Sequence, residues 1–135
     1  MIDKIAKHFD FQQRALGLRA YRNEVLASNV ANADTPQYKA VDFDFNQALA
    51  ESTELQRRRS LDMSKTNSRH LHGNVHTVNG AELQYRQAVQ PSIDGNTVDM
   101  DVERAKFTDN SLRYQTTTTF LNRRISGLSE AIKGQ

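Results

Sequence analysis

Residues 27–38 constrain the fold more than any other stretch, because they end a long helix at a defined place. Small residues and asparagines fill the end of the helical pattern, and Asp34-Thr35-Pro36 then stops it. Proline lacks the N–H that a helix needs and moves the preceding residue out of the helical region. The stretch holds no base beside a nucleophile. We therefore expect a structural corner, in which hydrogen bonds to backbone are made by Asn29, Asn32, Asp34 and Thr35.

The residues before this corner, 3–33, are predicted to form one helix with apolar residues on two sides. One stripe holds Ile2, Ile5, Phe9, Leu16, Leu26 and Val30, and the other holds Phe11, Ala15, Leu18, Tyr21 and Val25. A helix on the surface of a monomer usually has a single stripe. Two stripes are typical of a helix inside its own bundle or of one that also contacts neighbouring chains. Only one other long helix is expected, which favours neighbouring chains.

That second long helix is predicted over residues 100–132. Its apolar residues follow a heptad-like spacing, with Thr118 in the missing place: Phe107, Tyr114, Leu121, Ile125, Leu128 and Ile132. Asp99 is the expected N-cap, and Asp101 and Glu103 place negative charge in the first turn, facing the helix dipole. The seam predicts packing against the first helix or against other chains.

The polar middle of the chain, residues 34–97, is expected to be an insertion between the terminal helices. Its pattern predicts a short helix over about 44–56, short strands at 61–63 and 83–85, and a turn at Asp94-Gly95-Asn96-Thr97. The predicted fold is mainly α. Residues 1–33 and 98–135 pair as an antiparallel coiled-coil hairpin, and the partly irregular middle carries the short helix and a candidate β-hairpin.

Composition narrows the classes of function. Hydrophobic residues make up 37% of the 135 residues, tryptophan is absent and the mean hydropathy is −0.72, so a large compact core is not expected. A net charge of +2 does not favour nucleic acid, and Arg57-Arg58-Arg59 is expected to be a solvated helix end or loop. The absence of cysteine excludes disulfides and thiolate chemistry. Residues 1–8 lack the apolar run of a secretory signal, and no membrane span is expected.

Two patterns invite a metal-binding interpretation, and neither is complete. His70, His72 and His76 could place imidazoles on one face of a strand, but no Cys, Asp or Glu lies near them to complete a zinc shell. The stretch from Asp94 resembles a calcium loop until its fifth and sixth positions, which are Val98 and Asp99 instead of an oxygen ligand and glycine. We therefore expect no metal, no cofactor and no catalytic residue.

Read together, the two ends resemble the axial proteins of the bacterial flagellum, which form its rod, hook and filament junctions. The resemblance rests on Ala27-Ser28-Asn29-Val30-Ala31-Asn32-Ala33-Asp34-Thr35-Pro36 followed by Tyr38-Lys39-Ala40. Three further features are similar to the proximal-rod members of this family and extend the resemblance over nearly the whole chain. These features are Met63-Ser64-Lys65-Thr66-Asn67 with His70-Leu71, Asp94-Gly95-Asn96-Thr97-Val98-Asp99, and Glu103 with Asn110 and Tyr114.

The resemblance implies a structural subunit of the basal-body rod and not an enzyme. Such subunits are exported by the flagellar type III apparatus without a cleaved signal and self-associate in the periplasm through their terminal helices. Their implied partners are other rod proteins, the MS-ring adaptor FliE and the export gate. A different rod protein of the same family and a generic helical-bundle adaptor remain as alternatives. Gln37 stands where the family usually has glycine, which predicts a type I turn after Pro36.

Overall fold

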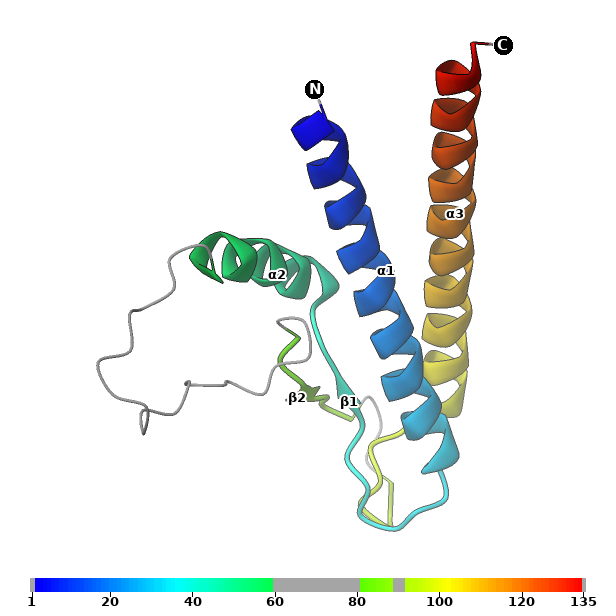
Figure 1. The fold of residues 1–135 in the computed structure, drawn as a ribbon. Helices are drawn as coiled ribbons and strands as arrows, with labels where there is room; N and C mark the ends of the chain where they lie inside the picture. The colour runs from blue at the N-terminus through cyan, green and yellow to red at the C-terminus, as the bar shows by residue number, and fades with distance from the viewer. Residues whose placement is uncertain (1, 60–80, 89–91, 135) are drawn as a thin grey trace, which may run out of the picture.

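The computed structural model describes residues 2–59, 81–88 and 92–134, and two long helices dominate it. The first helix, α1, spans Ile2–Ala31, and the last helix, α3, spans Met100–Lys133. They pack side by side in antiparallel directions, so both termini lie at the same end of the molecule (Figure 1). The protein is thus mainly helical, as the sequence predicts, with α1 ending slightly earlier than expected.

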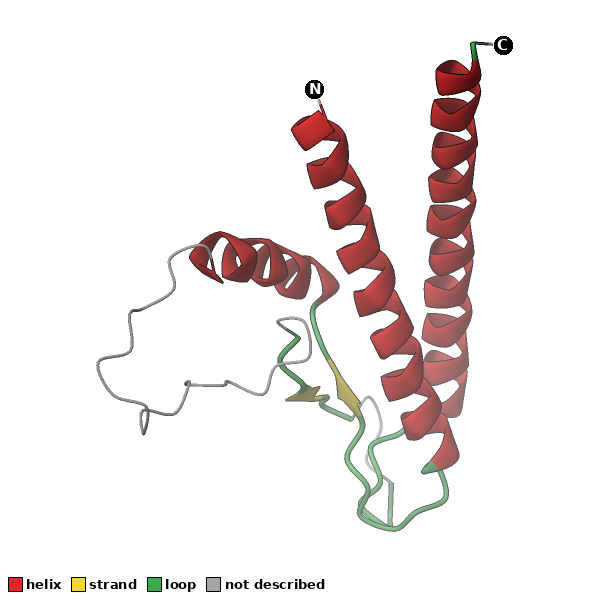
Figure 2. Cartoon of the chain, viewed as in Figure 1, coloured by secondary structure: helices red, strands yellow, loops and turns green. Residues whose placement is uncertain are grey.

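The middle segment forms a short helix and a small sheet beside α1 (Figure 2). Strand β1 spans Val41–Asp42, helix α2 spans Phe45–Arg59 and strand β2 spans Gln84–Tyr85. The strands are antiparallel, with Val41 opposite Tyr85 and Asp42 opposite Gln84. The expected strand at 83–85 is therefore present, and its partner is β1. The other expected strand, at 61–63, lies outside the described residues.

The apolar core lies where the middle segment covers one side of α1. Leu18, Phe43, Ala48 and Ala81 are buried there, and the ring of Tyr21 stacks on that of Phe43 with centroids 5.7 Å apart. Over these residues the second stripe of α1 packs against its own chain. This corrects the expectation that the stripe needs a neighbouring chain, because the sequence pattern did not show that α2 and β1 fold back onto α1.

The start of α3 matches its prediction, whereas its outer half is little covered. The Asp99 carboxylate accepts hydrogen bonds from the backbone N–H groups of Asp101 and Val102, as expected of an N-cap. Farther along, Leu121 and Leu128 are half-buried, but Ile125 and Ile132 are 49% and 86% exposed. The single chain thus covers only part of the heptad-like seam. In the described part of the chain, no helix has the length and apolar character needed to cross a membrane.

Candidate functional site

The corner after α1 is held by a side chain from the far end of the middle segment. The Asn96 Nδ2 atom donates to three carbonyl oxygens, those of Asn32, Ala33 and Thr35, at 3.1, 2.7 and 2.9 Å. These carbonyls belong to the turn that follows α1, and Asn96, which is 4% exposed, holds that turn from the other end of the middle segment. Asn32 adds a bond from its own Nδ2 to the Ser28 carbonyl at 2.8 Å. The chain therefore leaves and re-enters the helix pair at one place.

The turn after Pro36 differs from its prediction. Gln37 has a φ of 62°, whereas the third residue of a type I turn has a negative φ. The expected type I turn is therefore wrong. The Tyr38 N–H still closes the turn onto the Thr35 carbonyl at 3.3 Å, and the Gln37 N–H donates to the Asp94 carbonyl at 3.0 Å. This second contact explains the strained backbone, because it anchors Gln37 to the turn around Asp94.

The glycine of that second turn is needed by its backbone conformation. Gly95 has a φ of 77°, and a Cβ atom added to it would lie 3.9 Å from the Cα of Gln37. The Lys39 ammonium donates to the Gly95 carbonyl at 2.8 Å, and the Asp94 carboxylate accepts from the Asn96 N–H at 3.1 Å. The two turns thus brace each other, which gives the residues at 94–96 a structural role.

Asn29 joins α1 to both β1 and α3. It is fully buried, and its Nδ2 donates to the Val41 carbonyl at 2.7 Å and to Oε2 of Glu103 at 3.0 Å. Its Oδ1 accepts from the Val41 N–H at 3.1 Å and from the Tyr38 hydroxyl at 3.2 Å. An asparagine amide has two donors and two acceptor positions, and here every one is used. The prediction that Asn29 bonds to backbone is confirmed.

A network of charged side chains surrounds this amide. Glu103 is 1% exposed and forms an ion pair with Arg86, which also bonds to Asp42 at 2.7 Å. Arg22 binds both Asp42 carboxylate oxygens, at 3.1 and 3.0 Å, and the Lys106 ammonium lies 3.9 Å from the same carboxylate. The network connects α1, β1, α3 and the residue that follows β2. The network contains three cations and two carboxylates, so each carboxylate has at least one cation as a partner.

The surroundings shift two pKa values. Burial alone would raise the pKa of Asp42, but the hydrogen bonds and charge of Arg22, the Phe43 N–H and the charge of Arg86 outweigh it. The pKa of Asp42 is therefore lowered, and its carboxylate stays ionised. Burial and the neighbouring charge of Arg86 lower the pKa of Lys106, against the attraction of Asp42 and Glu103.

A second polar contact holds α3 against α1 farther along the pair. Asn110 is 1% exposed, and its Nδ2 donates to the Arg19 carbonyl and to Oδ1 of Asn23, both at 2.8 Å. Its own Oδ1 is buried and has no hydrogen-bond partner among the described residues. Because such polar groups tolerate few alternative positions, Asn110 and Asn29 together specify the register of the two helices.

The predicted junction residues divide into buried and exposed ones. Asn29 and Asn96 are at the centre, whereas Asp34, Thr35 and Pro36 are exposed, and the Thr35 hydroxyl donates to the Asn32 side chain instead of to backbone. The carboxylate of Asp34 has no bond to any described residue. Among the predicted packing residues, Leu18 and Val25 are buried and Phe9, Leu16 and Tyr21 half-buried; the side chain of Ile5 is not described.

Sequence reasoning missed the charged part of the junction. It assigned Glu103 to the helix dipole and gave no role to Asp42 or Arg86. The alternation of Val41, Asp42 and Phe43 does place Asp42 on the face of a strand opposite its apolar neighbours. No comparable local signal marks Arg86, because its partners lie 44 and 17 residues away.

The arrangement serves packing and positioning. Within residues 2–59, 81–88 and 92–134, no three His, Cys, Asp or Glu side chains are grouped so that they could hold a metal ion. His70, His72 and His76 lie outside the described residues, and Arg57–Arg59 form the end of α2. What the geometry supplies is a rigid joint between two helices and the segment inserted between them.

Comparisons with known proteins find a family model and relatives that carry the same description. A family model described as flagella basal body rod protein matches residues 9–39, which include the corner. Proteins named flagellar basal body rod protein FlgB are similar over nearly the full length. The Escherichia coli K12 protein is 47% identical over 98% of each chain, and the Salmonella typhimurium LT2 protein is 43% identical over 99% of each. The Cereibacter sphaeroides protein is 49% identical over 90% of this chain and 91% of its own.

Proposed function

The chain belongs to the FlgB family of flagellar basal body rod proteins, and from this membership we propose how it acts in the rod. It is a structural subunit of the basal body that associates with copies of itself and with other flagellar components. Its position is the proximal rod, where it connects the MS-ring and export gate, through the adaptor FliE, to the rest of the drive shaft. It reaches this place by export through the flagellar type III apparatus.

The observation that carries this function is the uncovered apolar surface of α3. Six large apolar side chains of this helix are between 38% and 86% exposed: Phe107, Leu112, Tyr114, Phe120, Ile125 and Ile132. A side chain of this size contributes about 1.5–3 kcal/mol when it becomes fully buried. A helix of 34 residues with so many uncovered is typical of a subunit that completes its packing in an assembly.

In the assembled rod, we propose that α1 and α3 form an antiparallel coiled-coil hairpin whose seam includes Tyr114, Leu121, Ile125, Leu128 and Ile132. Residues 1–33 and 98–135 form the rod core, and residues 34–97 form an inserted unit that leaves the core at the Asn96 corner. The buried contacts of Asn29 and Asn110 support this division, because they orient the two helices independently of the outer half of α3.

An Ile125→Asp substitution tests the role of the seam. Ile125 is half exposed in the single chain, so the variant should keep its helical circular dichroism and be exported normally. In the rod, however, the seam would bury an unpaired charge, and assembly should fail. The measurements are motility and the recovery of rods in purified basal bodies. Asn122→Asp, at an exposed polar position of the same helix, is the matched control. Normal motility of the Ile125→Asp variant would refute the seam.

A further inference from the structure

One exposed face of α3 has a pattern that reads similarly in both directions from Thr116. Four residues before and after it stand Leu112 and Phe120, both large and apolar; seven residues before and after stand Asp109 and Arg123, of opposite charge. At about 100° per residue, these five positions fall within an arc of about 80° on the helix surface. All five are exposed, and Leu112 and Phe120 are 62% and 63% exposed.

The symmetry extends one turn farther in each direction. Eleven residues from Thr116 lie Ala105 on one side and Gly127 on the other, both exposed. A Cβ atom added to Gly127 would meet nothing within 4 Å. The ends of the face are therefore flat, so they allow close approach of another helix.

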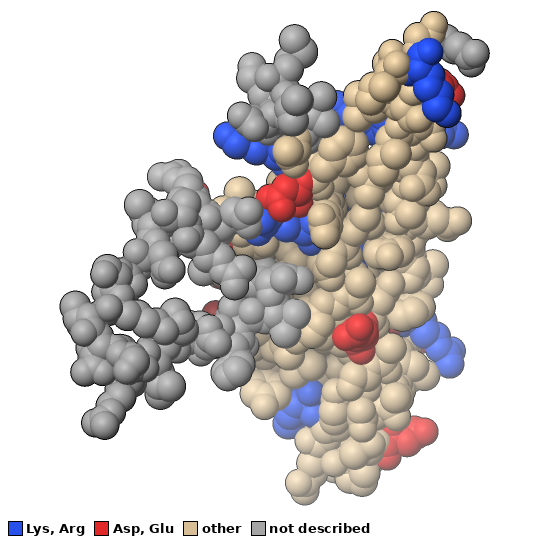
Figure 3. Space-filling model, in the orientation of Figure 1, with Lys and Arg blue, Asp and Glu red and all other residues tan. Residues whose placement is uncertain are grey.

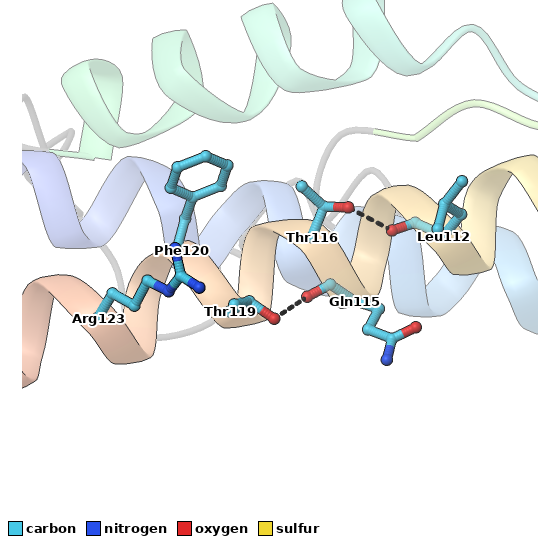
Figure 4. Close-up of a pocket in the computed structure, with 6 residues that line it drawn as sticks. All are labelled: Leu112, Gln115, Thr116, Thr119, Phe120 and Arg123. Atoms are coloured by element: carbon cyan, nitrogen blue, oxygen red, sulfur yellow. Dashed lines mark hydrogen bonds between the residues drawn. The ribbon is translucent and has the colours of Figure 1, made fainter.

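The centre of the face is hollow and largely free of unsatisfied polar groups. A pocket lies around Thr116 and Thr119, between Leu112 and Phe120, and Figure 4 shows these residues along one side of α3. The Thr116 hydroxyl donates to the Leu112 carbonyl at 2.8 Å, and the Thr119 hydroxyl donates to the Gln115 carbonyl at 2.9 Å. Because these hydroxyls are bonded within their own helix, the threonines can contact a partner through their methyl groups.

We infer that this face binds the same face of a second copy of the chain, with the two α3 helices antiparallel and a two-fold axis at Thr116. The charges on the face favour a second copy of the chain in this antiparallel orientation. In this arrangement Asp109 of one copy lies opposite Arg123 of the other, and Leu112 lies opposite Phe120, each contact occurring twice. A parallel pair would instead place Asp109 against Asp109 and Arg123 against Arg123, which is repulsive.

The charges next to the face are compatible with this pairing. On the side of α3 that is visible in Figure 3, most of the surface is uncharged. The neighbouring Arg113 already pairs with Asp109 in its own chain at 2.9 Å, and both side chains are more than half exposed. Asp109 can therefore contact both arginines, as carboxylates do in surface networks. A single helix crossing is small, so the dimer is weak and transient.

Cysteine crosslinking tests the two-fold axis directly, because the chain has no cysteine of its own. In a Thr116→Cys variant, two thiols meet at the axis, and mild oxidation should give a disulfide-linked dimer. Asn122→Cys, also exposed on α3 but off the face, is the matched control and should crosslink about tenfold less, because docking does not raise its local thiol concentration. Equal crosslinking of the two variants would overturn the pairing.

Charge reversal provides a second test on the uncrosslinked protein by sedimentation equilibrium. Asp109→Lys and Arg123→Asp should each weaken the dimer about tenfold, since both symmetry-related contacts become repulsive. The double variant should restore the wild-type dissociation constant within about twofold. Failure of the double variant to recover would overturn the proposed register. These measurements use purified protein, so they are independent of rod assembly and of the Ile125→Asp test.

Discussion

The ion pair between Arg86 and Glu103 is the contact whose loss should loosen the whole junction. In an Arg86→Met variant, Asp42 keeps Arg22 as a partner, but Glu103 keeps only one hydrogen-bond donor, the amide of Asn29, and the charge of Lys106, which forms no ion pair with it. Glu103 is 1% exposed, so its carboxylate would remain buried without a directly paired cation. Removing one partner of a buried pair typically costs about 3–5 kcal/mol. Because Arg86 itself is 19% exposed and admits some water, we expect the lower end, about 3 kcal/mol.

Hydrogen exchange measures this effect where it arises. A loss of about 3 kcal/mol corresponds to roughly a 150-fold loss of protection for amides that exchange by opening the junction. The informative amides are those of Val41, bonded to Asn29, and of Glu103, bonded to the Asp99 carbonyl at 2.9 Å. Their protection should fall together, because one network holds both.

Two further variants identify the cause. Adding Glu103→Gln to Arg86→Met removes the uncompensated charge while keeping a similar shape, so it should recover about half of the lost protection or more. Arg113→Met breaks an exposed pair on the same helix and should change protection by less than about threefold. If Arg86→Met behaves like Arg113→Met, or if Glu103→Gln gives no recovery, the buried charge does not couple the junction.

Three more outcomes follow from the corner and its charges. Asn96→Ala should cost about 1–2 kcal/mol by removing three hydrogen bonds of the corner and leaving the Ala33 carbonyl without a donor among the described residues, measured as faster exchange in the last turn of α1; unchanged exchange would contradict its role in holding the corner. The pKa of Asp42 is lowered on folding, so its contribution to stability is present above its unfolded pKa of about 3.9 and is lost as the pH falls through the folded value. Unfolding of Asp42→Asn should therefore depend less on pH between about 5 and 2 than that of the wild type, and parallel curves would refute this. Gln37→Gly should stabilise the protein by about 0.5–1 kcal/mol, because glycine adopts the positive φ without strain; a lower melting temperature would show that the Gln37 side chain contributes more than the strain costs.

Local signals predicted the parts of this fold that depend on local chemistry. The N-cap at Asp99 could be found because its donors lie two and three residues away. The end of α1 could be found because Pro36 stops a helix whatever surrounds it. The hydrogen bonds of Asn29 to backbone could also be predicted, because the corner returns the chain to α1 at Val41, only twelve residues later.

Features that depend on distant partners could not be predicted. The ion pairs of Arg86 form only when the two ends of the middle segment come into contact. No spacing of residues in the sequence predicts that contact. The conformation of Gln37 is similar: its side chain favours a type I turn, but the contact with Asp94 selects a positive φ. Likewise, the stripe of α1 at Leu18 and Tyr21 suggested a neighbouring chain, whereas Phe43 covers it from within.

The hydrogen bonds of Asn96 to the corner after α1 have a consequence for the order in which the chain can fold. A chain that emerges with its N-terminus first can form α1 early, but the donor that holds the corner arrives 64 residues after Asn32. The charge partner of Asn29 arrives 74 residues later, and Asn110 follows Arg19 by 91. Closure of such long loops is slow compared with helix formation. The contacts that hold α1 to the rest of the chain are therefore completed near the end of folding. Until most of the chain has emerged, α1 lacks these contacts.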